Sequence, residues 1–128
     1  MRLAVAAAVA LAASGSPVLA QSAEDGQKVF TQCRACHQVG PAARNAVGPV
    51  LNGLFGRRAG VVEGYSYSAA NKTSGIVWDE ATFREYIRDP KARLPGTKMI
   101  FAGLKDARKV DDLIAYLRTV QDEPPKSN

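Results

Sequence analysis

Histidine and cysteine are scarce in this chain of 128 residues, which contains one histidine and two cysteines. Together they offer three metal ligands, whereas a structural zinc site needs four, so the composition disfavours zinc. If the one histidine binds a metal, no other histidine remains to transfer protons during catalysis. The scarcity therefore argues against zinc sites and histidine acid–base pairs, and it directs attention to the segment where these three residues lie together.

Long apolar runs are absent beyond the N-terminus. There, Arg2 precedes an apolar run over residues 3–13 and then Val18-Leu19-Ala20, which together form the three zones of a secretory signal peptide. The run is shorter than the roughly 18 residues of a membrane-spanning helix. We therefore expect residues 1–20 to be a cleaved signal peptide. Residues 21–128 should form one domain in the periplasm, with at most peripheral membrane contact.

Positive charge exceeds negative charge, but it is not concentrated. The chain has 17 Lys and Arg residues against 12 Asp and Glu, a formal net charge of +5. The basic residues are scattered rather than gathered in one run, and an exported chain has little access to nucleic acid. The charge balance therefore favours an acidic protein partner or an anionic membrane surface, and we expect no nucleic-acid partner.

The hydrophobic pattern has helical periodicity and lacks the alternation of strands, so we predict an all-α fold with three main helices. The first is expected over residues 23–33 with Ser22 as its N-cap. The second should span residues 79–89, because Pro90 stops it. The third should span about residues 106–121. The residues predicted to be buried are Val29 and Phe30 in the first helix, Phe83, Tyr86 and Ile87 in the second, and Val110, Leu113, Ile114 and Leu117 in the third.

The segment between the first two predicted helices, residues 38–77, is rich in Gly, Asn and Ser and shows no periodic pattern. Structureless stretches of this length are uncommon in compact domains unless they serve a site. We therefore expect this segment to pack against something other than regular secondary structure. A large flat cofactor would provide such a surface.

The sequence Cys33-Arg34-Ala35-Cys36-His37 is a CxxCH motif, in which two thiols attach a haem and the adjacent imidazole binds its iron. The alternatives are a structural disulfide and a redox-active dithiol. A disulfide that closes so short a loop would restrict the unfolded chain little. A dithiol oxidoreductase would be expected on an α/β scaffold, which the pattern does not predict. Haem attachment is the favoured interpretation.

Met99 is the one methionine beyond the predicted signal peptide and lies in the turn-like segment Pro95–Met99. Most methionines fill gaps in a core, but Pro, Gly, Thr and Lys are unusual neighbours for a core position. A thioether ligand stabilises the reduced iron and raises its reduction potential. We predict iron ligation by His37 and Met99, with both axial positions closed for electron transfer. The alternative is a haem peroxidase or gas-binding protein with a labile sixth ligand.

These residues resemble the class I cytochromes c, particularly the short bacterial cytochromes c2 and their mitochondrial relatives. The match includes Cys33–His37, Gly48–Arg57, Gly64–Ser68 with Asn71, and Pro95–Met99. The resemblance implies a cytochrome c fold, in which long loops wrap around one covalently bound haem. It also implies a soluble, monomeric carrier, not an enzyme, that shuttles single electrons between a membrane donor complex and a membrane acceptor complex.

The resemblance further implies roles for individual residues. The Pro49 carbonyl should accept a hydrogen bond from the His37 ring, and Tyr86 should approach the Met99 sulfur. For Tyr86, core filling remains an alternative, because its helical spacing already explains it. The other implied cofactor-binding residues are Arg57, Tyr67 and Trp78 at the haem propionates, Asn71 and Thr97 in polar contacts near the haem, and Phe101 over the haem edge.

The resemblance also implies a helix crossing and a charged surface. Gly26 and Tyr116 match a close crossing of the first and last helices, with Phe30 and Leu113 beside it. Many relatives carry a ring of lysines around the haem edge, but this chain has Gln32, Ala46 and Ala92 at places where lysines are expected. A weaker positive face should remain, formed by Lys28, Arg34, Lys91, Lys98 and Lys105.

Overall fold

The computed structural model of the chain describes residues 22–124, so the predicted signal peptide lies outside the described residues. Within this range it contains five α-helices and one 3₁₀ turn, and it contains no strand, only one isolated β-bridge between Arg58 and Val77. The helices are α1 (Ala23–Phe30), α2 (Ala69–Thr73), α3 (Glu80–Arg88), α4 (Pro90–Arg93) and α5 (Ala107–Arg118), and the 3₁₀ turn η1 spans Thr31–Cys33. The prediction of an all-α fold is confirmed.

The first predicted helix is present, but its last turn is tighter than expected. Ser22 is the N-cap, and its side chain accepts a hydrogen bond from the Asp25 backbone at 3.0 Å. From Thr31 onward the bonds change to the i to i+3 pattern of a 3₁₀ turn, since the Thr31 N–H bonds to the Lys28 carbonyl. Cys33 is the last residue of this 3₁₀ turn.

The two later main helices begin where their capping residues predict. Asp79 caps α3 by accepting from the Thr82 backbone at 2.7 Å, and Asp106 caps α5 by accepting from the backbone of the next turn. Helix α5 ends at Arg118, earlier than residue 121. The residues after Arg118 leave the helix. Among them, Gln121 pairs through its side chain with the Phe55 backbone, at 3.1 Å to the N–H and 2.6 Å to the carbonyl.

Two short helices were not predicted. Helix α2 lies inside the segment expected to be a loop, and Ser68 caps it by accepting from the Asn71 backbone at 3.1 Å. Helix α4 follows α3 directly, with Pro90 at its first turn and Asp89 as its cap. Helices of four and five residues are too short to show a hydrophobic period, so the sequence pattern could not reveal them.

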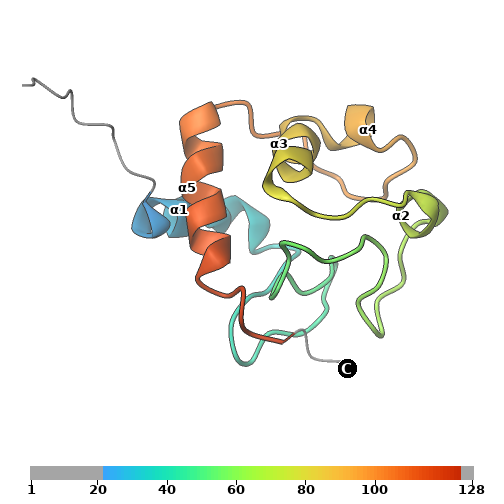
Figure 1. Cartoon of the computed structure of the whole chain (residues 1–128), viewed down its shortest axis with the longest axis horizontal. Coiled ribbons are helices and arrows are strands. Elements are labelled where there is room, and N and C mark those ends of the chain that lie inside the picture. Colours follow the sequence, from blue (N-terminus) through green and yellow to red (C-terminus); the bar gives the residue numbers. More distant parts are fainter. Residues whose placement is uncertain (1–21, 125–128) are drawn as a thin grey trace, which may run out of the picture.

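Helices α1 and α5 cross at one side of the molecule, while α3 and α4 lie above the loops that form its lower half (Figure 1). The crossing is close because Gly26 has no side chain. A Cβ atom built there would lie 1.9 Å from the Asp112 carbonyl oxygen. Beside the crossing, the rings of Phe30 and Tyr116 pack with centroids 5.4 Å apart. The predicted pairing of the first and last helices is confirmed.

The core lies among α1, α3 and α5 and contains nearly all the residues predicted to be buried; Val29 alone is half-buried. One polar residue is buried there as well. Asp112 is only 6% exposed, and its carboxylate accepts a hydrogen bond from the Ser22 backbone at 2.9 Å. The buried carboxylate is therefore partnered, and it ties the start of α1 to α5.

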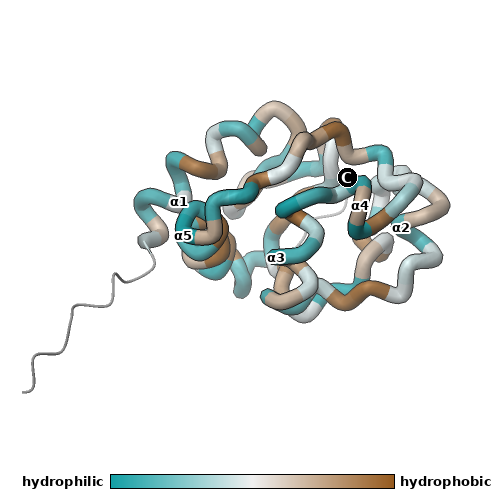
Figure 2. Tube along the Cα trace, turned by 90° about the horizontal axis from the view of Figure 1, so that it is seen from above, coloured by the Kyte–Doolittle hydropathy of each residue, from teal (hydrophilic) through white to brown (hydrophobic). Residues whose placement is uncertain are grey.

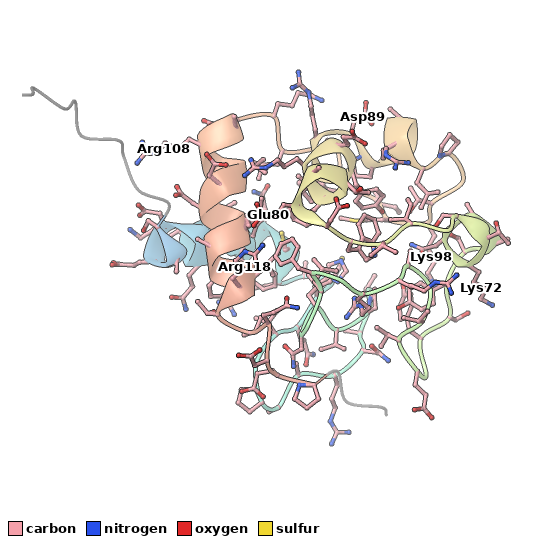
Figure 3. The ribbon with its side chains drawn as sticks, in the orientation of Figure 1. Lys72, Glu80, Asp89, Lys98, Arg108 and Arg118 are labelled. Carbon is pink, nitrogen blue, oxygen red and sulfur yellow. The ribbon has the colours of Figure 1, made fainter. Side chains whose placement is uncertain are left out.

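Ion pairs join the outer faces of α3 and α5. Arg118 contacts Glu80, with its Nε 2.8 Å from Oε1, and Arg84 pairs with Asp111 at 2.6 Å; the first pair lies between the two helices in Figure 3. Such exposed pairs contribute at most about 1 kcal/mol each. Among the described residues, no helix is long and apolar enough to cross a membrane, and apolar stretches alternate with polar ones along the chain (Figure 2).

Candidate cofactor-binding site

A cavity of about 270 Å³ lies between the helices and the long loops. Every residue predicted for the cofactor site lines it, including Cys33, Cys36, His37 and Met99. Natural protein interiors rarely contain voids much larger than a water molecule, so a cavity of this size indicates a ligand site. The structure thus brings together residues that are far apart in the sequence. Their roles toward a cofactor stay predictions.

The His37 ring is held in one tautomer. Its Nδ1 donates to the Pro49 carbonyl at 2.7 Å, which leaves the lone pair of Nε2 free for a metal. Burial lowers the pKa of His37, and the hydrogen bond to Pro49 partly opposes that effect. The imidazole is therefore neutral near pH 7, the form in which histidine binds metals.

Gly48 allows the loop to approach this ring. A Cβ atom at this position would lie 2.4 Å from His37 Cε1, closer than real Cβ atoms approach their neighbours. The Gly48 backbone also donates to the Cys36 carbonyl at 2.8 Å, so the loop is tied to the cysteine motif itself. Gly48 and Pro49 together form the support behind the imidazole.

Cys33 and Cys36 are half-buried and are not joined by a disulfide. Burial raises the pKa of the Cys33 thiol to about 11. Thiols of dithiol oxidoreductases need a lowered pKa, because the thiolate is the nucleophile. The environment of Cys33 therefore disfavours the redox-active dithiol and leaves a protonated thiol that faces the cavity.

Met99 receives a hydrogen bond from Tyr86, whose hydroxyl lies 3.3 Å from the Met99 sulfur and 3.1 Å from Thr97 Oγ1. Burial raises the pKa of Tyr86, so its hydroxyl stays protonated and able to donate. The Met99 backbone N–H also donates to Thr97 Oγ1, at 3.3 Å. The sulfur is therefore held in a defined position by its neighbours, unlike a methionine that fills a gap in a core.

Polar groups gather at another part of the cavity. The Arg57 guanidinium donates to the carbonyls of Val50 and Asn52 at 3.1 and 3.0 Å, and none of the ion pairs within residues 22–124 includes it. Burial lowers the pKa of Arg57. The Tyr67 hydroxyl accepts from the Val62 backbone at 3.0 Å, which leaves its proton free to donate. This region suits an anionic group.

The residues present fit a haem. Trp78 and Phe101 contribute to apolar walls for a flat ring, while the cation of Arg57 suits its carboxylates. Asn71 gives independent evidence for a ligand in the cavity, because its Oδ1 is buried and has no hydrogen-bond partner among the described residues. A buried acceptor without a partner costs about 1–3 kcal/mol, so the site is shaped for a further polar group at this point.

Sequence reasoning missed two residues that shape the loops. Asn52 is fully buried, and its side chain bonds to both the N–H and the carbonyl of Gly40, at 2.8 and 2.9 Å. Tyr65 lies in a matched motif but had no predicted role, although its hydroxyl reaches the Val47 carbonyl. Nothing in the local pattern signals either contact, because the partners are far apart in the sequence.

Three known proteins that are similar to this chain are all named as cytochromes. The chain is 66% identical over 108 residues to cytochrome c2 of Blastochloris viridis, which covers 84% of this chain and 85% of the relative. It is 58% identical to cytochrome c-550 of Nitrobacter winogradskyi, over 73% of this chain and 86% of the relative. Among solved structures, cytochrome cH from Methylobacterium extorquens matches with a TM-score of 0.72 and 47% identity, and it covers 77% of this chain and 98% of its own.

The family model described as cytochrome c matches residues 23–121, nearly the whole described range. The helices, the cavity and the CxxCH motif agree with that match, and the high identities extend it over most of the chain. The chain belongs to the cytochrome c family, whose members are c-type cytochromes.

Proposed function

We propose that this chain is a soluble, diffusible single-electron carrier of the periplasm, in which Cys33 and Cys36 attach one haem c and His37 and Met99 bind its iron. The family implies the covalent haem, and relatives named cytochrome c2, c-550 and c-554 support a carrier. The assignment of each ligand rests on the CxxCH motif and the segment around Met99, and the geometry of the cavity supports it.

One observation carries this proposal: His37 and Met99 line the same cavity, and each is fixed by a hydrogen bond that leaves a donor atom available. The Pro49 carbonyl accepts a hydrogen bond from Nδ1 of His37, which leaves Nε2 of the ring available. Tyr86 donates to Met99 without using both lone pairs of the sulfur. A rigid pair of ligands limits reorganisation when the charge of the metal changes.

When bound, haem supplies an iron that changes by one electron between the ferrous and ferric states. The residues of the chain set the conditions for that change. Arg57 and Tyr67 would hold the carboxylates, while apolar side chains keep water from the ring. Tyr86 withdraws electron density from the sulfur, which favours the reduced state.

A catalytic role as a peroxidase or gas-binding protein is the less favoured function. His37 is the sole histidine, so no other imidazole is available to transfer protons on the opposite side of a metal. The relatives are named as cytochromes rather than as enzymes. We therefore propose that the chain is not an enzyme.

The site at which partners dock is proposed to lie where the cavity meets the surface. Two apolar side chains there are exposed although they line the cavity: Ile100 is 92% exposed and Val47 is 71% exposed. Lys98 lies at the same opening. Lys28 contributes less to attraction, because it pairs with Asp25 at 3.1 Å. We propose transient docking to acidic membrane complexes, with an apolar contact at the centre.

Rapid mixing of the ferrous protein with membrane oxidases tests this function. We expect one electron to be transferred per chain, at a rate that falls severalfold between low and physiological salt, since screening weakens charge attraction. Lys91→Gln should lower the rate at low salt, whereas Gln27→Ala, an exposed substitution without charge change, should not. Strong peroxide turnover by the intact ferric protein without transfer to any oxidase would reverse the assignment.

The chain without haem should be largely unfolded. A cavity costs about 24 cal/mol per Å³, so failure to fill this one would cost about 6 kcal/mol, within the 5–15 kcal/mol that stabilise a typical domain. The measurement is an amide NMR spectrum of residues 21–128 expressed in a cytosol that lacks haem-attachment machinery. The exported protein with haem is the control. Well-dispersed amide signals from the haem-free chain would contradict this prediction.

A further inference from the structure

Tyr65, for which the sequence predicted no role, contacts two loops at the edge of the cavity. Its hydroxyl donates to the Val47 carbonyl at 2.7 Å. Val47 directly precedes Gly48 and Pro49, the two residues that support the His37 ring. The Tyr65 hydroxyl therefore holds residues 45–50, the His37 loop, at the edge of the cavity.

The same tyrosine ring contacts the segment that carries Met99. The Lys98 ammonium lies 4.4 Å from the centre of the Tyr65 ring, a cation–π distance, and it also donates to the Ser66 carbonyl. Lys98 directly precedes Met99, and Figure 3 shows it on the side of the molecule where α2 lies. Residues 95–101, the Met99 loop, are thus held to the segment that contains Tyr65.

The position of Tyr65 is well defined. Its ring is half-buried and packs edge-on against Tyr67, with centroids 4.7 Å apart, and Tyr67 is itself held by the Val62 backbone. Val47, Tyr65 and Lys98 all line the cavity. The chain of contacts from Val47 through Tyr65 to Lys98 therefore runs along the edge of the cavity, from the loop that supports His37 to the loop that carries Met99.

Asn45 also connects the His37 loop to the segment before Tyr65, but its hydrogen bonds within the described range do not reach the Met99 loop. Asn45 donates to the Glu63 carbonyl at 3.0 Å and accepts from the Val50 backbone at 3.0 Å. This contact supports the His37 loop locally. Tyr65, in contrast, reaches both loops, through its hydrogen bond to Val47 and its cation–π contact with Lys98.

We propose that Tyr65 is a positioning residue that couples the His37 loop to the Met99 loop, so that the two loops open together. The contacts on its two sides are of different kinds, a hydroxyl donor toward Val47 and a ring face toward Lys98. Substitutions can therefore remove each side separately. The proposal deepens the proposed function, because one of the coupled loops supports the ring of His37 and the other carries Met99, the two proposed iron ligands.

The first test is amide hydrogen exchange in the ferrous protein with haem, followed by mass spectrometry of the two loops. Tyr65→Phe removes only the hydroxyl and should speed exchange in both loops roughly fivefold, the factor of one net hydrogen bond. Tyr116→Phe is the matched control, since within residues 22–124 its hydroxyl makes only a long hydrogen bond, at 3.5 Å, with Arg34. Faster exchange in the His37 loop alone, or in neither loop, would overturn the coupling.

The second test alters the contact between Tyr65 and the Met99 loop. Lys98→Gln removes the charge of the side chain without adding a sulfur donor beside Met99, and Lys98 makes no hydrogen bond or ion pair to the His37 loop within the described residues. It should nevertheless speed exchange in the His37 loop roughly twofold or more, and this effect should vanish in the Tyr65→Phe background. An unchanged His37 loop, or an undiminished effect in the double variant, contradicts the proposal.

A third measurement uses imidazole as an external ligand of the ferric protein with haem. Imidazole binds the metal when the Met99 loop has opened, so its apparent affinity reports the open fraction. Tyr65→Phe should raise that affinity roughly fivefold, while Tyr116→Phe should leave it unchanged. Equal affinities for Tyr65→Phe and the unaltered protein would overturn the proposal. If the unaltered ferric protein lacks an iron–sulfur band, Met99 ligation fails instead, and hydrogen exchange still decides the coupling.

Discussion

Replacing Met99 with leucine should abolish the weak iron–sulfur charge-transfer band of the ferric protein and lower its reduction potential. The fall should be on the order of 0.2 V, within the roughly 0.8 V range over which axial ligands set haem potentials. Leucine keeps the volume of the side chain but has no sulfur donor. The thioether stabilises the ferrous state, and Tyr86 strengthens that preference by its hydrogen bond at 3.3 Å.

The matched control for this variant is Ile100→Ala, at the next position in the chain. Ile100 is 92% exposed, so its truncation should change neither the band nor the potential. Redox titration followed by visible absorption measures both quantities in one experiment. If Met99→Leu retained the band and its potential stayed within about 20 mV of the unaltered protein, a third of the 59 mV that a tenfold change represents, Met99 would not be the ligand.

Gly26→Ala should destabilise the protein with haem by about 3 kcal/mol or more. The added Cβ atom would lie 1.9 Å from the Asp112 carbonyl oxygen and 2.6 Å from its carbonyl carbon. These atoms are backbone, so they cannot turn away, and α1 and α5 would have to separate. Overpacking of this kind typically costs about 1–3 kcal/mol and sometimes more. The separation would also loosen the Phe30–Tyr116 contact.

Guanidinium unfolding of the protein with haem, followed by circular dichroism, measures this loss. Gln27→Ala is the control because it adds no atom, lies on the exposed side of the same helix and should change stability by less than about 0.5 kcal/mol. Failure to recover any folded Gly26→Ala protein would be the extreme form of the expected result. A loss below about 1 kcal/mol would show that the helices tolerate separation.

The main helices could be predicted because their signals are local. Ser22, Asp79 and Asp106 cap α1, α3 and α5 at the expected positions. The apolar spacing within each helix also gave the buried face correctly. The ends were harder to predict, because they depend on tertiary contacts. The end of α5 is set by Gln121, which bonds to Phe55 in a loop far along the chain.

The candidate ligands were also accessible from the sequence. The CxxCH motif places Cys33, Cys36 and His37 within five residues, so their chemistry is readable without a fold. Met99 stood out because it is the single methionine beyond the predicted signal peptide, in a segment of polar and turn-forming neighbours. The resemblance to a family supplied the supporting residues, and the structure places all of them along one cavity.

The sequence by itself therefore determined the class of fold, the capped starts of the main helices and the chemical types that face the cavity, since each depends on residues close together in the chain. The tertiary structure alone decided how the loops are held. Asn52 bonds to Gly40, and Tyr65 lies between Val47 and Lys98, through contacts that span many residues. Glycine-rich loops have no hydrophobic period, so only their folded path shows which side chains meet.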